Sequence, residues 1–124
     1  MTKGHSAKPR VLVVDDERVI ADTLATILNQ NGFDASAVYS GGDAVDRALA
    51  SRPDLVISDV IMQDMNGIEA AIRIRKGLPK CKILLFSGQA ATADLLEKAR
   101  KQGHEFEILA KPVHPQDLLA KIRT

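Results

Sequence analysis

The sequence predicts a doubly wound α/β fold, in which helices cover both faces of a five-stranded parallel sheet. Strand-length apolar runs alternate with amphipathic stretches, and the connections between them are short. The central runs are almost purely apolar, as is typical of strands that are covered on both faces. The chain has 124 residues, of which 45% are hydrophobic and 27% charged. These values fit one soluble domain, because domains run roughly 100 to 200 residues.

Five apolar runs are the predicted strands. They are residues 11–14, 35–39, 55–58, 82–86 and 106–110. The second run is more polar than the others, which favours a place at the edge of the sheet. The first, third and fourth runs are the most apolar and should lie in the middle. These features together favour the strand order 2-1-3-4-5.

Five stretches with apolar residues at helical spacing are the predicted helices. The apolar stripes fall within residues 20–28, 44–49, 68–72, 95–99 and 118–122. Gly32, Pro53, Gly77 and Gly103 follow the first four stripes and mark where those helices end. Pro115 is placed in the first turn of the last helix, where a missing amide hydrogen costs nothing. Strands and helices therefore alternate along the whole chain.

Charge and composition exclude several classes of protein. With 17 basic and 16 acidic residues, the net charge is +1, so no strong field for nucleic acid or acidic lipid is expected. No unbroken apolar run is long enough to span a bilayer. A lone cysteine, Cys81, excludes an internal disulfide framework and a thiolate zinc cluster. We expect a cytoplasmic protein with an N-terminal leader at 1–9 and one domain at 10–124.

Polar side chains follow four of the predicted strands. Asp15 and Asp16 follow the first strand, Asp59 the third, Ser87 the fourth and Lys111 the fifth. Ligands in open α/β sheets bind beyond the carboxyl ends of the strands. We therefore expect these five residues to converge at one end of the sheet.

The chemistry of this set predicts a phosphoryl acceptor assisted by a metal. Three neighbouring carboxylates repel one another unless a cation joins them, and oxygen ligands in an open site favour Mg²⁺. The charge of Lys111 and the hydroxyl of Ser87 suit phosphate oxygens. A carboxylate can accept a phosphoryl group as an aspartyl-phosphate. Asp59, alone at the end of a central strand, is the best placed to do so.

These motifs resemble a known family. Asp15-Asp16, Asp59 with the residues 60–67 that follow it, Ser87 and Lys111-Pro112 are similar to the signature of the response-regulator receiver domain of two-component signalling. The resemblance covers about residues 10–123 and is of the chemotaxis-receiver type. It implies a flavodoxin-like fold and a protein that promotes its own phosphorylation and slow dephosphorylation, without being an enzyme in the usual sense.

The resemblance also implies a role for each matching residue. Asp59 would accept a phosphoryl group from a sensor histidine kinase or phosphotransfer protein, while Ser87 and Lys111 contact the phosphoryl oxygens. The implied Mg²⁺ ligands are Asp15 (largely through water), Asp16, Asp59 and the backbone carbonyl of Ile61. The Lys111–Pro112 peptide would be cis. An unknown downstream target would bind the face formed by the fourth helix, fifth strand and fifth helix.

Four positions depart from the usual family pattern. Gln63 stands where Pro is common, Asn66 where Asp often precedes the Gly, and Val113 where an aromatic residue is frequent. Ile108 occupies the switch position, three residues before Lys111, which is usually Tyr or Phe. The stretch before Lys111 is also long for the family, which leaves open a bulge that lets Phe106 substitute.

Two further positions concern the lifetime of the phosphorylated form. In related receivers, the residues two after the acceptor and two after the Ser or Thr help to place or exclude the hydrolytic water. Here they are Ile61, which cannot orient water, and Gln89, which can. We predict a long-lived phosphorylated form.

Other interpretations remain for the single motifs and for the whole. An acidic pair after a strand is often only a helix N-terminus, and Ser-Gly is an ordinary cap. A phosphatase of the haloacid-dehalogenase type needs an acid where Ile61 stands, and a flavodoxin-like electron carrier would have its phosphate repelled by the acids after the first strand. The alternative that remains is a pseudo-receiver, a protein-binding module that works without phosphorylation. We expect a monomer or weak dimer that binds neither nucleic acid nor membrane directly.

Overall fold

The computed structural model describes residues 8–88 and 91–123, in which strands and helices alternate as predicted. The elements in chain order are β1 (Arg10–Val14), α2 (Arg18–Asn29), β2 (Asp34–Val38), α3 (Gly41–Ser51), β3 (Leu55–Asp59), α4 (Gly67–Gly77), β4 (Lys82–Ser87), α5 (Ala91–Lys101), β5 (Glu107–Ala110) and α6 (Pro115–Ile122). Each predicted strand lies within one residue of the observed bounds at either end.

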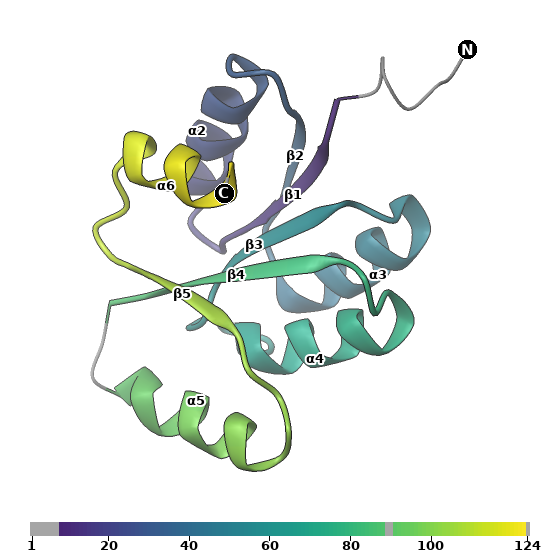
Figure 1. Ribbon diagram of the computed structural model, residues 1–124, viewed down its shortest axis with the longest axis vertical. Helices are drawn as coiled ribbons and strands as arrows, with labels where there is room; N and C mark the ends of the chain where they lie inside the picture. Colours follow the sequence, from purple (N-terminus) through teal and green to yellow (C-terminus); the bar gives the residue numbers. More distant parts are fainter. Residues whose placement is uncertain (1–7, 89–90, 124) are drawn as a thin grey trace.

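The five strands form one parallel sheet in the order β2-β1-β3-β4-β5 (Figure 1). This confirms the predicted order and the edge position of the more polar run. In β2 only Ala35 and Val38 are buried, whereas four of the five residues are buried in each of β1 and β3. The more polar run is therefore the less buried strand, at the edge of the sheet.

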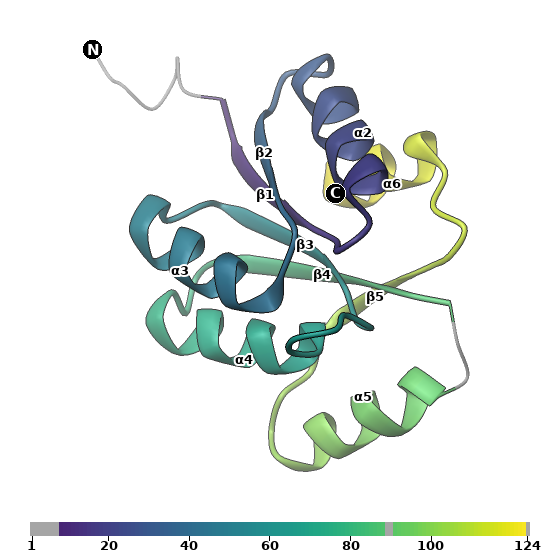
Figure 2. The same cartoon turned by 180° about the vertical axis from the view of Figure 1, so that it is seen from behind.

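Helices cover both faces of the sheet, with α2 and α6 on one side and α3, α4 and α5 on the other (Figures 1 and 2). Strand β4 serves both layers, because Ile83 and Leu85 pack toward α3, α4 and α5 while Leu84 and Phe86 pack toward α2 and α6. This explains why its apolar run has no alternation. None of the helices in the described residues has the length and apolar character needed to cross a membrane.

The ends of the helices follow local sequence signals. The side chains of Ser40 and Asn66 accept hydrogen bonds from backbone amides in the first turns of α3 and α4. Gly32 and Gly103, which follow α2 and α5, have positive φ angles of 92° and 91°. Side chains with a Cβ rarely adopt that conformation, so these glycines turn the chain toward the next strand.

The last strand differs by one residue from the predicted run and decides between the two alternatives left open for Phe106. Strand β5 begins at Glu107 rather than at Phe106, and its four residues pair with β4 in unbroken register, without the bulge that would move Phe106 along the strand. Ile108 pairs with Leu85 and holds the switch position. The Phe106 ring instead lies 4.3 Å from the guanidinium of Arg75 on α4, so it does not replace Ile108.

Candidate functional site

The predicted aspartates and lysine lie close together at the carboxyl end of the parallel sheet, as expected. Carboxylate oxygens of Asp15, Asp16 and Asp59 all lie within 4.8 Å of one another. The Nζ of Lys111 lies 2.9 Å from Oδ2 of Asp59. The acids come from the ends of β1 and β3, and the lysine follows β5. Strands with different places in the sequence thus build one charged cluster.

Asp15 is buried and only half satisfied by the protein. Its Oδ1 accepts a hydrogen bond from the amide of Glu17 at 2.9 Å, while Oδ2 is buried and has no hydrogen-bond partner among the described residues. Burial is the main reason that the pKa of Asp15 is raised, and the charge of Asp59 adds to the effect. A buried oxygen without a partner in a native site calls for an explanation.

Asp59 is held between a cation and a backbone amide. It is only 7% exposed; Oδ2 accepts from Lys111, and Oδ1 accepts from the amide of Ile61 at 3.4 Å. Burial by itself would lower the pKa of Lys111, but the hydrogen bond and the charge of Asp59 outweigh it, so that the pKa is raised. Lys111 therefore stays protonated and acts as a fixed positive charge beside Asp59.

The cluster fits a hard divalent cation such as Mg²⁺. It offers three carboxylates and no histidine or cysteine, and one oxygen of Asp15 has no partner within the protein. Hard cations prefer such oxygen ligands, and a positive charge at this place would relieve both the repulsion and the missing hydrogen bond. The roles of Ile61 as a carbonyl ligand and of Asp15 through water stay predictions.

Ser87, at the end of β4, is half-buried and shares a hydrogen bond with the hydroxyl of Thr92. Thr92 lies in the first turn of α5 and is 2% exposed. The sequence reasoning did not find Thr92, because a threonine in a helix carries no signal for this contact. The hydroxyl of Ser87 is thus tied to α5 in this structure. Gln89, which was predicted to act on the hydrolytic water, lies outside the described residues.

Two glycines let the backbone close around the site. A Cβ at Gly67 would lie 2.0 Å from the carbonyl oxygen of Asp59, and a Cβ at Gly88 would lie 2.8 Å from Cβ of Lys111. The amide of Gly67 donates to the carbonyl of Val60 at 2.7 Å. The Lys111–Pro112 peptide is cis, as the resemblance implied. The start of α4 is therefore pressed against the end of the strand that carries Asp59.

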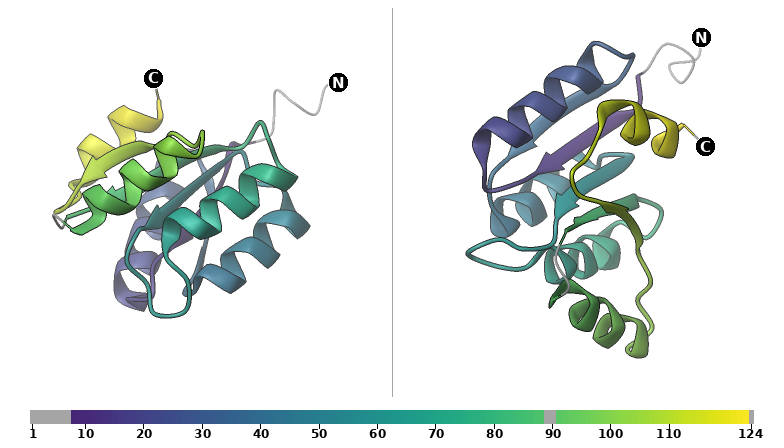
Figure 3. Two further views of the ribbon diagram at one scale, coloured as in Figure 1. Left: turned by 90° about the horizontal axis from the view of Figure 1, so that it is seen from below. Right: turned by 90° about the vertical axis from the view of Figure 1, so that its left-hand side faces the viewer.

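The loop of residues 60–66, between β3 and α4, extends beyond the end of the sheet (Figure 3). The amide of Gln63 donates to Oδ2 of Asp16 at 3.3 Å. The next residue, Asp64, accepts from the amides of Gly41 and Gly42 at the start of α3. Sequence reasoning missed Asp64, because its partners lie more than twenty residues away and no local pattern connects them.

An open apolar groove of about 620 Å³ adjoins the cluster. Val19 of α2 is 79% exposed and lines this groove together with Ile20, Pro112 and Val113. Lys111 also lines it, so the groove reaches the charged cluster. A partner that covers this groove would therefore come close to Asp59.

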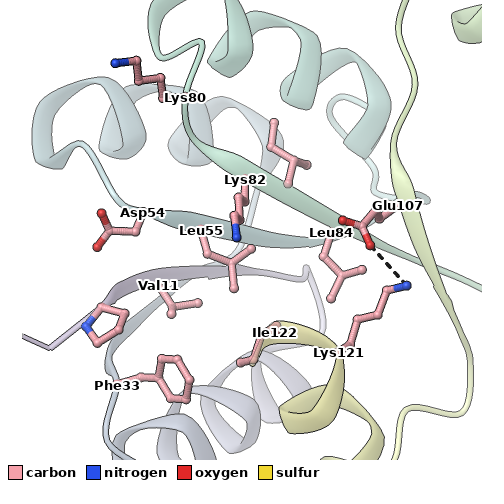
Figure 4. Close-up of a pocket in the computed structure, with 12 residues that line it drawn as sticks. Val11, Phe33, Asp54, Leu55, Lys80, Lys82, Leu84, Glu107, Lys121 and Ile122 are labelled. Carbon is pink, nitrogen blue, oxygen red and sulfur yellow. Dashed lines mark ion pairs between the residues drawn. The ribbon is translucent and has the colours of Figure 1, made fainter. Parts of the chain in front are cut away.

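A second cavity, of about 410 Å³, lies at the opposite, amino end of the strands (Figure 4). Three of its charged side chains have partners: Nζ of Lys121 lies 3.2 Å from Oε2 of Glu107, and Asp54 accepts from the amide of Arg10 at 2.8 Å. The nearby Cys81 is buried, which raises the pKa of its thiol to about 11. We find no unsatisfied buried polar side chain in this part of the described structure.

Comparison with known proteins agrees with this geometry. A receiver domain structure from Methanospirillum hungatei JF-1 is 26% identical, with a TM-score of 0.85 over 94% of this chain and 92% of that one. The chemotaxis protein CheY4 of Vibrio cholerae is 28% identical, with a TM-score of 0.81 over 94% and 98%. These likenesses show a fold of the chemotaxis-receiver type, as the strand order indicates.

Sequence relatives agree. The DNA-binding response regulator MtrA of Mycolicibacterium paratuberculosis is 30% identical over 118 residues, which are 94% of this chain and 50% of that protein. The probable transcriptional regulatory protein TcrX of Mycobacterium tuberculosis is 29% identical over 99% of this chain and 52% of that protein. The chain thus spans about half the length of these relatives. The family model of the response regulator receiver domain matches residues 11–123, and this chain belongs to that family, whose members are phospho-acceptors in two-component signalling.

Proposed function

We propose that Asp59 is the phospho-acceptor of this receiver domain, and that Mg²⁺ and Lys111 assist the transfer. The observation that carries the proposal is the geometry around Asp59, whose carboxylate lies within 4.8 Å of oxygens from Asp15 and Asp16 and 2.9 Å from the Lys111 ammonium. Receiver domains use Mg²⁺ at an acidic pocket, and the aspartate cluster of this chain supports such a site.

In the proposed reaction, a carboxylate oxygen of Asp59 attacks the phosphorus of a phosphohistidine on the donor. A bond forms between this oxygen and phosphorus, and the bond between phosphorus and the histidine nitrogen breaks. Its electron pair stays on this nitrogen, and the histidine leaves as a neutral imidazole because the other ring nitrogen carries a proton. Lys111 stabilises the negative charge on the phosphoryl oxygens, because its ammonium is a fixed charge at the acceptor. A bound Mg²⁺ would neutralise further charge on these oxygens.

The proposed metal ligands are Asp16, Asp59 and the Ile61 carbonyl, with Asp15 acting largely through water. Asp15 supports this assignment, because its buried Oδ2 has no partner among the described residues and a water or cation there would supply one. The assignment also fits the oxygen-only chemistry of the cluster.

The proposed output begins at Ser87. In this structure its hydroxyl is bonded to Thr92 of α5. A phosphoryl group on Asp59 offers three strong acceptors to the Ser87 hydroxyl and competes with Thr92 for it. A shift of Ser87 would then reach α5 and β5, which together with α6 form the surface proposed for the downstream target. Ile108, rather than an aromatic side chain, occupies the switch position on β5.

The proposed donor is a sensor histidine kinase or phosphotransfer protein, in the cytoplasm. Such a donor must bring its histidine next to Asp59, and the apolar groove beside Lys111, with Val19 exposed, offers a surface to cover. The net charge of +1 supports a domain that makes no direct contact with nucleic acid. The long-lived phosphorylated form predicted from Ile61 is part of the same proposal.

Intact-mass measurement with acetyl phosphate and Mg²⁺ tests this function. We expect the wild-type protein to gain one phosphoryl group, and Asp59→Asn or removal of Mg²⁺ to prevent the gain. Asp54→Asn is a matched control, because Asp54 precedes the same strand at the far end of the sheet and is exposed. A wild-type protein that gains no mass with any small donor or kinase would instead be a pseudo-receiver.

A further inference from the structure

The loop of residues 60–66 contacts the acidic cluster through its backbone. The amide of Ile61 donates to Oδ1 of Asp59 at 3.4 Å, and the amide of Gln63 donates to Oδ2 of Asp16 at 3.3 Å. Two of the three clustered carboxylates are therefore oriented by this loop. Both bonds are long, so a small shift of the loop would break them.

The Gln63 contact depends on a departure from the family pattern. Proline, which is common at this position, has no amide hydrogen and could not donate to Asp16. Gln63 has the backbone amide that proline lacks. It does not have the fixed φ angle of proline, so the loop has more conformational freedom. The loop therefore needs another contact to hold it in place.

Asp64 supplies such a contact. Its Oδ1 accepts from the amide of Gly41 at 3.0 Å, and its Oδ2 accepts from the amide of Gly42 at 2.9 Å. These amides belong to the first turn of α3, where backbone donors have no partner within the helix and a negative charge is favoured. The bonds, chiefly that from Gly42, lower the pKa of Asp64, so the carboxylate stays charged at neutral pH.

Packing supports the same anchor. A Cβ on Gly41 would lie 3.0 Å from Cβ of Met65, so the chain next to Asp64 lies directly against the start of α3. The ends of the loop are fixed separately, because β3 leads into it and the amide of Gly67 bonds to Val60. Asp64 and Met65 thus hold the middle of the loop on a helix that contributes no residue to the aspartate cluster.

We propose that Asp64 is a positioning residue for the metal site: its two bonds to the start of α3 hold the loop so that the amides of Ile61 and Gln63 keep the carboxylates of Asp59 and Asp16 turned toward each other. This proposal rests on the proposed function, because it assumes that the cluster binds Mg²⁺. Asp64 itself touches neither the phosphoryl group nor the metal.

Calorimetric titration of unphosphorylated protein with Mg²⁺ tests the proposal. We expect Asp64→Ala to weaken Mg²⁺ binding roughly tenfold, as the loss of a residue that orients metal ligands commonly does. Asp64→Asn keeps one acceptor oxygen, so its Mg²⁺ affinity should lie between those of the wild type and Asp64→Ala. Asp46→Asn is the matched control, because it removes an exposed carboxylate from α3, the helix to which Asp64 bonds. This variant should bind Mg²⁺ with the affinity of the wild type.

Two further measurements separate positioning from a general loss of stability. Amide hydrogen exchange should quicken at Gly41 and Gly42 in both Asp64 variants. Phosphorylation by acetyl phosphate should need more Mg²⁺ for half-maximal rate in Asp64→Ala, with the maximal rate at saturating Mg²⁺ close to that of the wild type. A variant that was merely unstable would lose the maximal rate instead.

The outcomes are distinguishable. Equal Mg²⁺ affinity of Asp64→Ala and the wild type, within twofold, would overturn the role of Asp64 and leave the proposed function standing. A lower maximal rate with unchanged affinity would also overturn it. If the wild-type protein binds no Mg²⁺, the proposed metal site itself fails and this inference fails with it. Should Asp64→Ala not fold, the Asp64→Asn variant carries the same comparison.

Discussion

The two ends of the sheet carry the same types of charged residue, but these are exposed and paired at the amino end and buried next to like charges at the carboxyl end. At the amino end, Lys121 and Glu107 form an exposed ion pair at 3.2 Å, and Asp54 bonds to a backbone amide. At the carboxyl end, Asp15 and Asp59 are buried, and their oxygens lie within 4.8 Å of a third carboxylate. Lysines and acids are present at both ends, yet only one end leaves a buried charge unsatisfied among the described residues.

The charged residues at the two ends of the sheet therefore contribute differently to stability and to function. Exposed pairs in water contribute little to stability, because solvent and salt screen them. Buried like charges cost stability, and a protein retains them where they bind or react. We therefore expect changes at the carboxyl end to alter the free energy of unfolding and metal binding, and equivalent changes at the amino end to alter neither.

The largest expected effect is that of Gly67→Ala at the carboxyl end. The new Cβ would lie 2.0 Å from the Asp59 carbonyl, which belongs to a central strand and cannot move easily. We expect a loss of about 3 kcal/mol in the free energy of unfolding, as for a severe overpacking. Urea denaturation measures it.

Gly77→Ala is the control at the other end of the same helix. Its Cβ would meet only the tip of the exposed Leu49 side chain, which can rotate away. We expect a change below about 1 kcal/mol. Equal losses in the two variants would show that the close approach at Asp59 has no special cost.

Mg²⁺ should stabilise the protein almost as strongly, and only through the carboxyl end. A ligand that binds only the folded state adds about 2.7 kcal/mol at a concentration one hundred times its Kd. Thermal unfolding with increasing Mg²⁺ measures the gain, with Na⁺ at equal ionic strength as the control. Asp59→Asn should lose most of this gain, whereas Asp54→Asn should keep it. A similar gain in both variants would place the ion elsewhere.

The fold and most of the cluster could be predicted because their causes are local in the sequence. Apolar runs give the strands, and the polarity of the second run places it at the edge. Parallel strands end at the same side of a sheet, so Asp15, Asp59 and Lys111 had to converge. The cis Lys111–Pro112 peptide is different, since only the family resemblance pointed to it.

The residues that escaped prediction depend on contacts between groups on different elements. Asp64 bonds to a helix that begins 23 residues earlier, and the hydroxyl of Thr92 in α5 bonds to that of Ser87 at the end of β4. Phe106 was placed in the last strand by its apolar character, yet its ring lies against Arg75 of α4. No periodicity or turn signal reports such side-chain contacts, which appear only when the helices are in place.

Asp15→Asn should stabilise the protein in the absence of Mg²⁺, by about 1–2 kcal/mol at neutral pH. The substitution removes a buried charge near Asp59, and the pKa of Asp15 is raised above 3.8 mainly by burial. An acid whose pKa is raised on folding holds its proton more tightly in the folded state. The wild type therefore loses stability as the pH rises from 3.8 through the raised pKa, and Asp15→Asn lacks this loss.

Urea denaturation across that pH range, without Mg²⁺, tests the sign of the effect. The difference between Asp15→Asn and the wild type should grow as the pH rises and then level off. Asp54→Asn, at the amino end, should differ little from the wild type at any pH, because its carboxylate is exposed. A destabilised Asp15→Asn would mean that the Asp15 carboxylate supports the fold.

The smallest effect is expected from Lys121→Ala, which breaks the ion pair with Glu107 at the amino end. The two side chains are 39% and 71% exposed, so water already solvates both charges when they are apart. We expect a change below about 0.5 kcal/mol, which shrinks further at high salt. A double-mutant cycle with Glu107→Ala isolates the pair from the packing of the lysine stem. A coupling free energy above about 1 kcal/mol would mean that this exposed ion pair also contributes to stability. The electrostatic difference between the two ends would then come from the sign of the neighbouring charges and not from their burial.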